Sequence, residues 1–153
     1  MKVVYHCYGG AHASSTAAAI HLGLLPADRI PTKEELLAAP FYDGPDSSTH
    51  GMLNYVGNDD HGNEVFILGR RQQAKMMERL LKEMVKMLGK NPEEWKFVNC
   101  YQPFNYIMML GGFSSRALKI TFFGRPIVIY GTRWAYKKIC RIVQQTKKEL
   151  GYT

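Results

Sequence analysis

The side chains best suited to chemistry lie together near the N-terminus, between Cys7 and Thr16. The Cys7 thiol could act as a nucleophile, and the His12 imidazole could serve it as a base or donate to a phosphate. The other residues that matter in this segment are small or carry a hydroxyl: Gly9, Gly10, Ala11, Ser14, Ser15 and Thr16. Backbone amides and hydroxyls bind anions, so the segment predicts a site for phosphate or another anionic group.

A strand and a helix must position this segment. Residues 3–7 are apolar and rich in β-branched and aromatic side chains, which is typical of a buried strand. Glycine adopts positive φ without strain, so Gly9 and Gly10 are expected to end that strand. Ser14, Ser15 and Thr16 are predicted to cap a helix over residues 16–23. The free N–H groups and positive dipole end of such a helix favour an anion.

The reactivity of Cys7 separates a binding site from a catalytic one. A thiol that faces a helix N-terminus is stabilised as the nucleophilic thiolate. A cysteine at the end of a buried strand can equally serve packing alone, and both interpretations stay open. Cys140 falls near the core stripe of a later helix, which favours packing.

Basic and small residues follow two further predicted strands, over residues 64–68 and 127–130. The second of these strands is expected to be central, and the residues after it to open the last helix. Parallel strands end at one edge of a sheet, where ligands bind in α/β folds, provided that the strand over 64–68 runs parallel to the first. The residues predicted to join the anion site there are Arg70, Arg71, Gly131, Thr132 and Arg133.

Strands that alternate with helices predict an α/β fold: a three-layer arrangement with a mostly parallel sheet flanked by helices. Strands over residues 52–56 and 64–68 would form an inserted antiparallel hairpin, and residues 96–100 and 120–123 further strands. Helices are expected over residues 36–39, 72–88 and 104–110, the first of them preceded by a capping box of Thr32 and Glu35. The loop over residues 40–51 is long enough to be a functional flap, although the sequence does not say whether it closes over the site.

The composition predicts one domain over residues 1–153, with 46% hydrophobic and 22% charged residues. No apolar run approaches the roughly 20 residues that span a bilayer, and no secretory signal precedes the first strand, so no membrane association is expected. Three cysteines without a close pair favour free thiols in a reducing compartment, hence a cytoplasmic protein. The oligomeric state is left open.

The basic excess is confined to the C-terminal quarter. Residues 116–153 hold nine Lys or Arg and one acid, a net +8, whereas the other residues carry eleven bases and twelve acids, a net −1. This asymmetry indicates either an anionic partner, including nucleic acid or an acidic protein, or a solvated basic helix face. No recognised nucleic-acid-binding motif accompanies the charge.

The first loop differs from the familiar phosphate loops. It has no lysine of a Walker A motif, no G-x-G-x-x-G dinucleotide pattern and no compact metal-ligand spacing, so no metal is predicted. His6 and Cys7 resemble the start of the H-C-x5-R loop of cysteine phosphatases, but Ala13 stands at the arginine position. The spacing of Cys7, Gly10 and Ser14 is similar to that of the IIB components of sugar phosphotransferase systems, over about a dozen residues; in those proteins the cysteine carries a phosphoryl group.

Nearly the whole chain resembles a family of small Gram-positive bacterial proteins known as domain of unknown function 3189. The resemblance rests on YHCYGGAHASS at residues 5–15, AAAIHLG at 17–23, EVFILGRR at 64–71 and GRPIV at 124–128. Membership implies a bacterial cytoplasmic protein and implies no activity, substrate or catalytic residue.

Three hypotheses follow. The first is a protein that binds a phosphate-bearing, nucleotide-like or otherwise anionic small molecule at residues 7–16, helped by the basic residues of the other strand ends. The second is an enzyme that transfers a phosphoryl or other group through Cys7 as the nucleophile, with His12 as its base. The third is a nucleic-acid or protein-binding module that uses the basic C-terminal helix. The sequence leaves the cofactor unknown and a metal requirement open.

Overall fold

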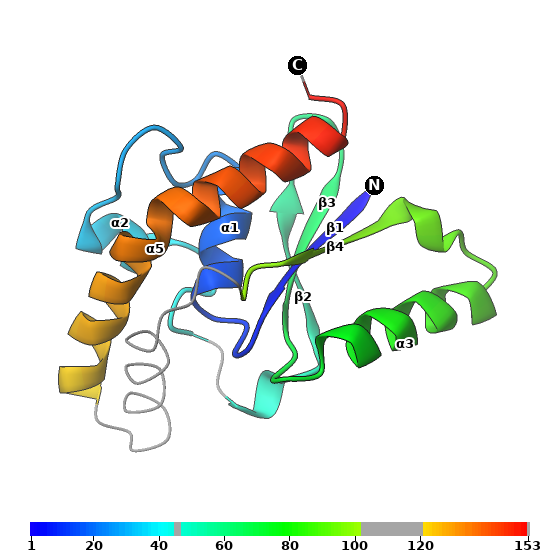
Figure 1. Ribbon diagram of the computed structural model, residues 1–153, viewed down its shortest axis with the longest axis horizontal. Helices are drawn as coiled ribbons and strands as arrows, with labels where there is room; N and C mark the ends of the chain where they lie inside the picture. The colour runs from blue at the N-terminus through cyan, green and yellow to red at the C-terminus, as the bar shows by residue number, and fades with distance from the viewer. Residues whose placement is uncertain (45–46, 102–120, 153) are drawn as a thin grey trace.

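A four-stranded sheet in the order β2-β3-β1-β4 forms the centre of the fold (Figure 1). The computed structural model describes residues 1–44, 47–101 and 121–152. Strand β1 (Lys2–Cys7) pairs in parallel with β3 (Glu64–Gly69) on one side and with β4 (Trp95–Asn99) on the other, while β2 (Leu53–Asn58) runs antiparallel to β3. This mixed sheet with flanking helices confirms the α/β class.

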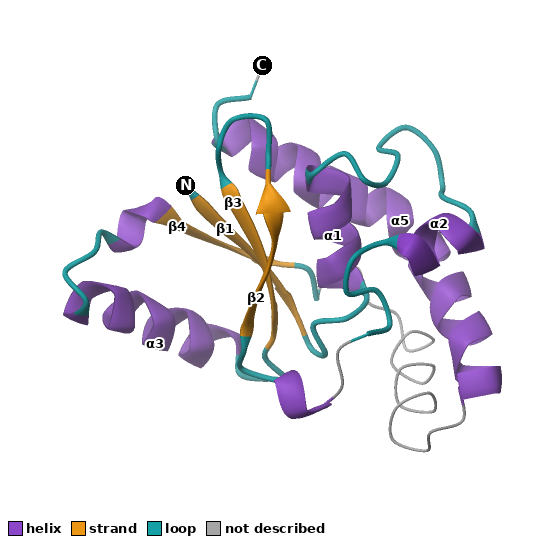
Figure 2. Ribbon diagram, turned by 180° about the vertical axis from the view of Figure 1, so that it is seen from behind, coloured by secondary structure: helices purple, strands orange, loops and turns teal. Residues whose placement is uncertain are grey.

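The helices lie on both sides of the sheet (Figure 2). Helices α1 (Ala13–His21) and α5 (Thr121–Glu149) lie on one side and α3 (Ala74–Met87) on the other. The six-residue α2 (Lys33–Ala38) and two 3-10 turns, Ser47–Thr49 and Pro92–Glu94, complete the described elements. None of the helices in this part of the chain is both long and apolar enough to cross a bilayer.

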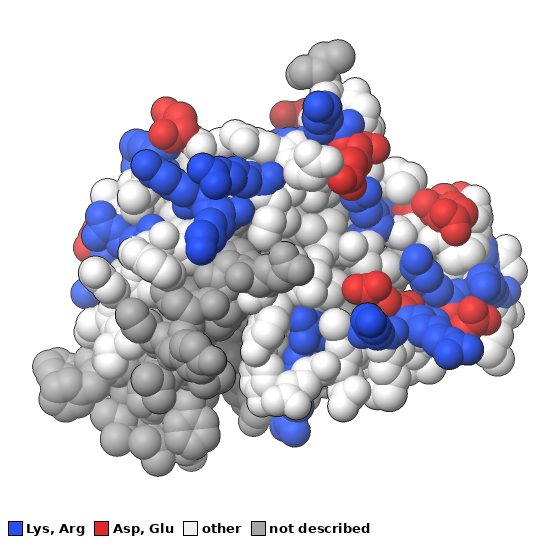
Figure 3. All heavy atoms as spheres, in the orientation of Figure 1, with Lys and Arg blue, Asp and Glu red and all other residues white. Residues whose placement is uncertain are grey.

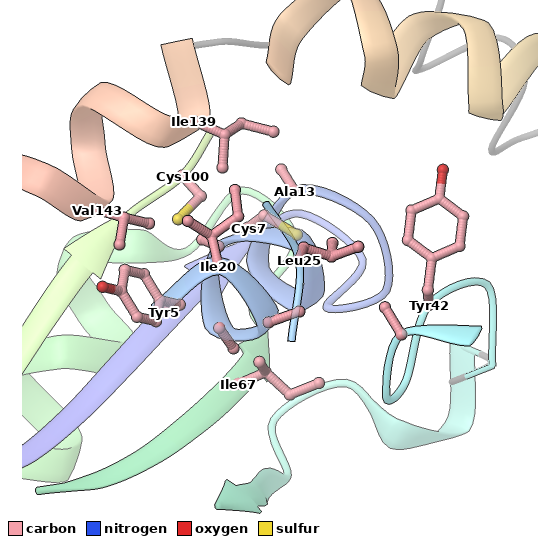
Figure 4. Packing of buried hydrophobic residues seen from close by; sticks show 14 of the residues in the cluster. Tyr5, Cys7, Ala13, Ile20, Leu25, Tyr42, Ile67, Cys100, Ile139 and Val143 are labelled. Carbon is pink, nitrogen blue, oxygen red and sulfur yellow. The ribbon is translucent and has the colours of Figure 1, made fainter. Parts of the chain in front are cut away.

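The main core lies between the sheet and the α1–α5 pair. Successive side chains of a strand point to opposite faces, so Tyr5 and Cys7 face α1 while His6 faces α3. Figure 4 shows Tyr5 and Cys7 packed with Ile139 and Val143 of α5, and all four side chains are buried. Full burial of an aliphatic side chain such as Ile139 or Val143 contributes about 1.5–3 kcal/mol, which holds α5 against β1.

The prediction of strands over residues 120–123 and 127–130 is wrong, because residues 121–130 lie within α5. The local β-branched run favoured a strand, but its burial continues a longer helical pattern that packs against α1. Residue 120 lies outside the described residues. The buried side chains of α5 lie on one face, three or four residues apart or adjacent: Val128, Ile129, Thr132, Ala135, Tyr136, Ile139, Cys140, Val143 and Thr146.

Helix α1 begins at Ala13, three residues earlier than predicted. Ser14, Ser15 and Thr16 therefore occupy its first turn rather than its cap, and the N-cap residue His12 makes no side-chain cap bond. The capping box of α2 is confirmed: the Glu35 amide donates to Thr32 Oγ1 at 3.2 Å, and the Thr32 amide donates to Glu35 Oε2 at 2.7 Å. The predicted helix over residues 104–110 lies outside the described residues.

Candidate functional site

The carboxyl ends of β1, β3 and β4 share one edge of the sheet. The chain leaves β1 toward α1 and leaves β3 toward α3 on the opposite face, so the loops of these two neighbouring strands diverge. Such a divergence is the usual place for a ligand in an α/β sheet. The expectation that Arg70 and Arg71 share this edge with Cys7 is confirmed: the Arg70 amide donates to Cys7 O at 3.1 Å and the Arg71 amide to Tyr8 O at 2.9 Å.

A contact between two glycines fixes the first loop against the end of β3. Gly10 has φ +75°, and a Cβ on it would lie 2.7 Å from the Gly69 nitrogen. A Cβ on Gly69 would in turn lie 2.8 Å from the Gly9 oxygen. Only residues without a side chain allow the two backbones to approach this closely.

The Cys7 sulfur sits inside this loop, at the start of α1. It accepts a hydrogen bond from the Gly10 amide at 3.2 Å, and Ser14 Oγ lies 3.2 Å away, where either group can donate. The Cys7 side chain is buried. The Gly10 amide and the Ser14 hydroxyl are thus the groups of the described chain that contact the sulfur.

The first turn of α1 holds buried hydrogen-bond donors. Ala13, Ser14 and Ser15 are at most 1% exposed. Among the described residues no acceptor meets their backbone amides, the first helical bond being Thr16 N to His12 O, and none meets the buried Thr16 Oγ1. Unpaired amides are rare in a protein interior, and no acidic side chain occupies this turn.

The loop after α2 packs over this segment. Asp43 N donates to Ala11 O at 3.0 Å, and His12 Nε2 lies 3.3 Å from Asp43 Oδ1. The Tyr42 ring contacts the His12 ring edge-on, and the Tyr42 hydroxyl donates to Thr132 Oγ1 at 2.8 Å. Burial raises the pKa of Tyr42, which keeps its hydroxyl a donor. Within the part of the chain that the structure describes, no hydrogen bond joins His12 to Cys7, so the expected pair of nucleophile and base is not in contact.

Arg70 points to the other face of the sheet and does not join the Cys7 loop. Its Nε donates to His6 Nδ1 at 3.2 Å and its Nη2 to Asn99 Oδ1 at 3.1 Å, and Nη1 donates to the carbonyl of Arg71. His6 Nε2 lies 2.9 Å from Glu78 Oε1 on α3. Burial lowers the pKa of His6 and Arg70 adds to that effect, against the opposing Glu78 carboxylate, so neutral His6 accepts from the guanidinium.

The other basic residues expected at the site also lie elsewhere. Arg71 has φ +51° and is exposed, and its Nε donates to His50 Nδ1 at 3.1 Å. Gly131, Thr132 and Arg133 lie in the middle of α5, so they do not open a helix there and offer no free amides. Thr132 is linked to the site through the Tyr42 hydroxyl, and Arg133 is exposed.

Sequence reasoning missed Asp43 and Asn99. Asn99 ends β4, so the same rule about strand ends that selected Arg70 would have selected it. No sequence signal identifies Asp43, because its contact with His12 spans 31 positions and depends on the path of the loop.

The exposed bases of α5 form a separate surface, which is visible over this helix in Figure 3. Trp134 is exposed beside them, with Lys138 Nζ 5.4 Å from its ring centroid. The bases lie on the side of α5 that faces away from the core: Arg133, Lys137, Lys138, Arg141 and Lys148.

Comparison with known proteins identifies the family. The chain matches the family described as "Protein of unknown function (DUF3189)" over residues 2–148, nearly its whole length. The chain belongs to DUF3189. No curated protein and no solved structure matches it. The description of DUF3189 names no ligand or reaction, so the function of this member is argued from its geometry.

Proposed function

We propose that this DUF3189 protein binds a phosphate-bearing or other anionic small molecule at the segment from Cys7 to Thr16. The observation that carries the proposal is the group of buried donors at the start of α1 that meet no acceptor among the described residues. Each buried donor without a partner costs about 1–3 kcal/mol, and the oxygens of an anion would offset that cost. The N-terminal end of the helix dipole adds to the attraction.

The ligand would be held by amides and hydroxyls rather than by a guanidinium. Arg70 faces away from the loop, and no arginine stands at position 13. The imidazole of His12, held by Asp43, is the titratable group nearest in sequence to the unpaired amides. This arrangement favours a ligand with a single phosphate or similar group, such as a sugar phosphate or a mononucleotide.

The experiment is calorimetric titration with inorganic phosphate, sugar phosphates and nucleotides, comparing the natural chain with Thr16→Val. The substitution removes only the unpaired hydroxyl and keeps the volume, so the free protein should be no less stable. We expect the Kd to rise about tenfold, the loss of one hydrogen bond to a charged group.

Thr146→Val is the matched control, because Thr146 is also a buried helical threonine but its hydroxyl is satisfied by Ile142 O at 2.8 Å. It should bind with unchanged affinity. The proposal is wrong if no ligand of this class binds, or if Thr16→Val binds as tightly as the control.

Group transfer through Cys7 is the second candidate, favoured by the two 3.2 Å contacts of its sulfur. In that reaction the Cys7 thiol would lose its proton to solvent, and its Sγ would form a bond to the phosphorus of the bound ligand as the bond to the leaving oxygen breaks. The leaving oxygen would take a proton. His12, which Asp43 orients, is the candidate proton donor. The same anion site would serve binding and transfer.

The exposed bases of α5 support a weaker proposal, an acidic macromolecule such as nucleic acid bound on that helix.

We also propose that the protein is bacterial and cytoplasmic, as the sequence predicts. For the fold we propose a three-layer arrangement with an inserted hairpin, which the position of α3 opposite α1 supports.

A further inference from the structure

We propose that the groove between the start of α3 and the ends of β3 and β4 is a second anion-binding site, which takes the phosphate or diphosphate group of a small molecule through Arg70. The groove lies on the α3 face of the sheet, and its residues are not those of the Cys7 loop. The proposal therefore goes beyond the proposed function and does not depend on it.

The buried Arg70 guanidinium is the main evidence. Its residue is 6% exposed, and three of its five N–H groups donate to His6, Asn99 and the Arg71 carbonyl. The other two N–H groups meet no acceptor among the described residues, and no carboxylate of that part of the chain forms an ion pair with Arg70. The Glu78 carboxylate contacts Nε2 of neutral His6, whereas Arg70 contacts Nδ1 of the same ring. Burial of a cation without a direct counter-ion costs free energy, and a bound anion would offset that cost.

The groove beside Arg70 is positively charged. It has a volume of about 450 Å³, and the charged side chains that line it are Arg70 and Lys75, with no acid among them. Asn99 contributes a side-chain amide, whose oxygen already accepts from Arg70 and from the Tyr101 amide at 2.9 Å. Its Nδ2 meets no acceptor among the described residues and is left to donate to a ligand.

The start of α3 adds backbone donors to the same groove. Ala74, Lys75 and Met76 line the groove and form the first turn of this 14-residue helix. The first helical bond runs from Met77 N to Gln73 O, and in the described part of the chain the amides of residues 74–76 meet no acceptor. The turn carries no acidic side chain and no side-chain cap, so the positive end of its dipole is unopposed.

These donors fit a phosphate rather than a cation or a neutral ligand. The groups left to contact a ligand are the N–H groups of Arg70, Lys75, Asn99 and the first turn of α3, all of them donors, and a guanidinium suits phosphate oxygens. The groove is larger than a single phosphate and falls within the range of sites for whole small molecules. The Tyr101 ring, 5.2 Å from Arg70 Cζ, forms one wall, against which a planar or sugar moiety could pack.

The test is titration of the full chain with pyrophosphate, followed by calorimetry and by the amide NMR spectrum. We expect the amide signals of residues 74–76 to shift on titration. Reversing the exposed charge in Lys75→Glu should raise the Kd about tenfold or more. Lys90→Glu, an exposed lysine after α3 that does not line the groove, should change it less than about twofold.

Two variants separate this site from the Cys7 loop. Thr16→Val should leave the pyrophosphate-induced shifts of the amide signals of residues 74–76 unchanged. Arg70→Lys keeps the charge but loses the paired N–H groups of the guanidinium, so these shifts should become smaller at the same pyrophosphate concentration. If Arg70→Lys does not fold, the comparison of Lys75→Glu with Lys90→Glu decides alone. Absence of shifts at residues 74–76, or equal affinities in those two variants, overturns the proposal whatever happens at the Cys7 loop.

Discussion

Substitution of Gly10 by alanine tests whether the first loop is held by contact with the end of β3. Two costs are expected. Alanine at φ +75° adopts the left-handed region, at about 1–2 kcal/mol. Its Cβ would also lie 2.7 Å from the Gly69 nitrogen, and overpacking of this kind costs about 1–3 kcal/mol. The free energy of unfolding should therefore fall by about 3 kcal/mol, which lowers Tm by about 6–12 °C for a chain of this size.

The chain offers a control for each cost. Gly23 has φ +72°, and a Cβ on it would meet no heavy atom within 4 Å, so Gly23→Ala should show only the conformational cost. Gly69 is not in the left-handed region, and its Cβ would lie 2.8 Å from the Gly9 oxygen, so Gly69→Ala should show only the steric cost. The decreases in the free energy of unfolding of these two variants should add up to roughly the decrease in Gly10→Ala.

Urea denaturation of the three variants measures these losses, with equal m values required for the comparison. The reasoning is refuted if Gly10→Ala loses no more stability than Gly23→Ala, because a Cβ between Gly10 and Gly69 would then have no steric cost. Ligand binding gives a second readout, since a loop displaced from Gly69 should also bind phosphate more weakly.

Two further predictions concern Cys7 and Asp59. Iodoacetamide at neutral pH should alkylate Cys7 faster than Cys100, whose pKa burial raises, and phosphate should slow it; equal rates would remove Cys7 as a nucleophile. Burial raises the pKa of Asp59, but hydrogen bonds from Tyr152, His21 and Asn63 outweigh it, so the net pKa lies well below its ordinary value. A depressed pKa stabilises the fold above about pH 3.9 and loses that effect as the pH falls further, so the stability lost in Asp59→Asn should shrink in acid. A loss that is the same at neutral and acid pH contradicts this.

Local sequence was sufficient for much of the sheet and of the first loop. Strand β1 is buried from Val3 to Cys7, and Gly10 after it supplies the positive φ of 75° at the turn toward α1. The alternation of a strand also determines that His6 and Cys7 point to opposite faces. The capping box of Thr32 and Glu35 depends on residues three positions apart, so it could be predicted without any tertiary contact.

Contacts distant in the chain decided the rest. The run from Ile127 to Tyr130 has the local preference of a strand, and only the packing of the whole α5 face against α1 makes it helical. That helix buries Thr132 in mid-turn, which removes the second helix N-terminus expected at the anion site.

The division of the candidate site also arises from tertiary structure. Sequence places Arg70 at the same sheet edge as Cys7, but the turn of the chain after β3 sends its guanidinium to His6 and Asn99 on the other face. The position of Asp43 over His12 likewise depends on a loop that returns to Ala11. Sequence alone thus placed Cys7, Gly10 and Arg70 at this edge, because strand ends and glycines are local features. Only the folded chain decided which face each group serves, since that depends on contacts between residues far apart in the sequence.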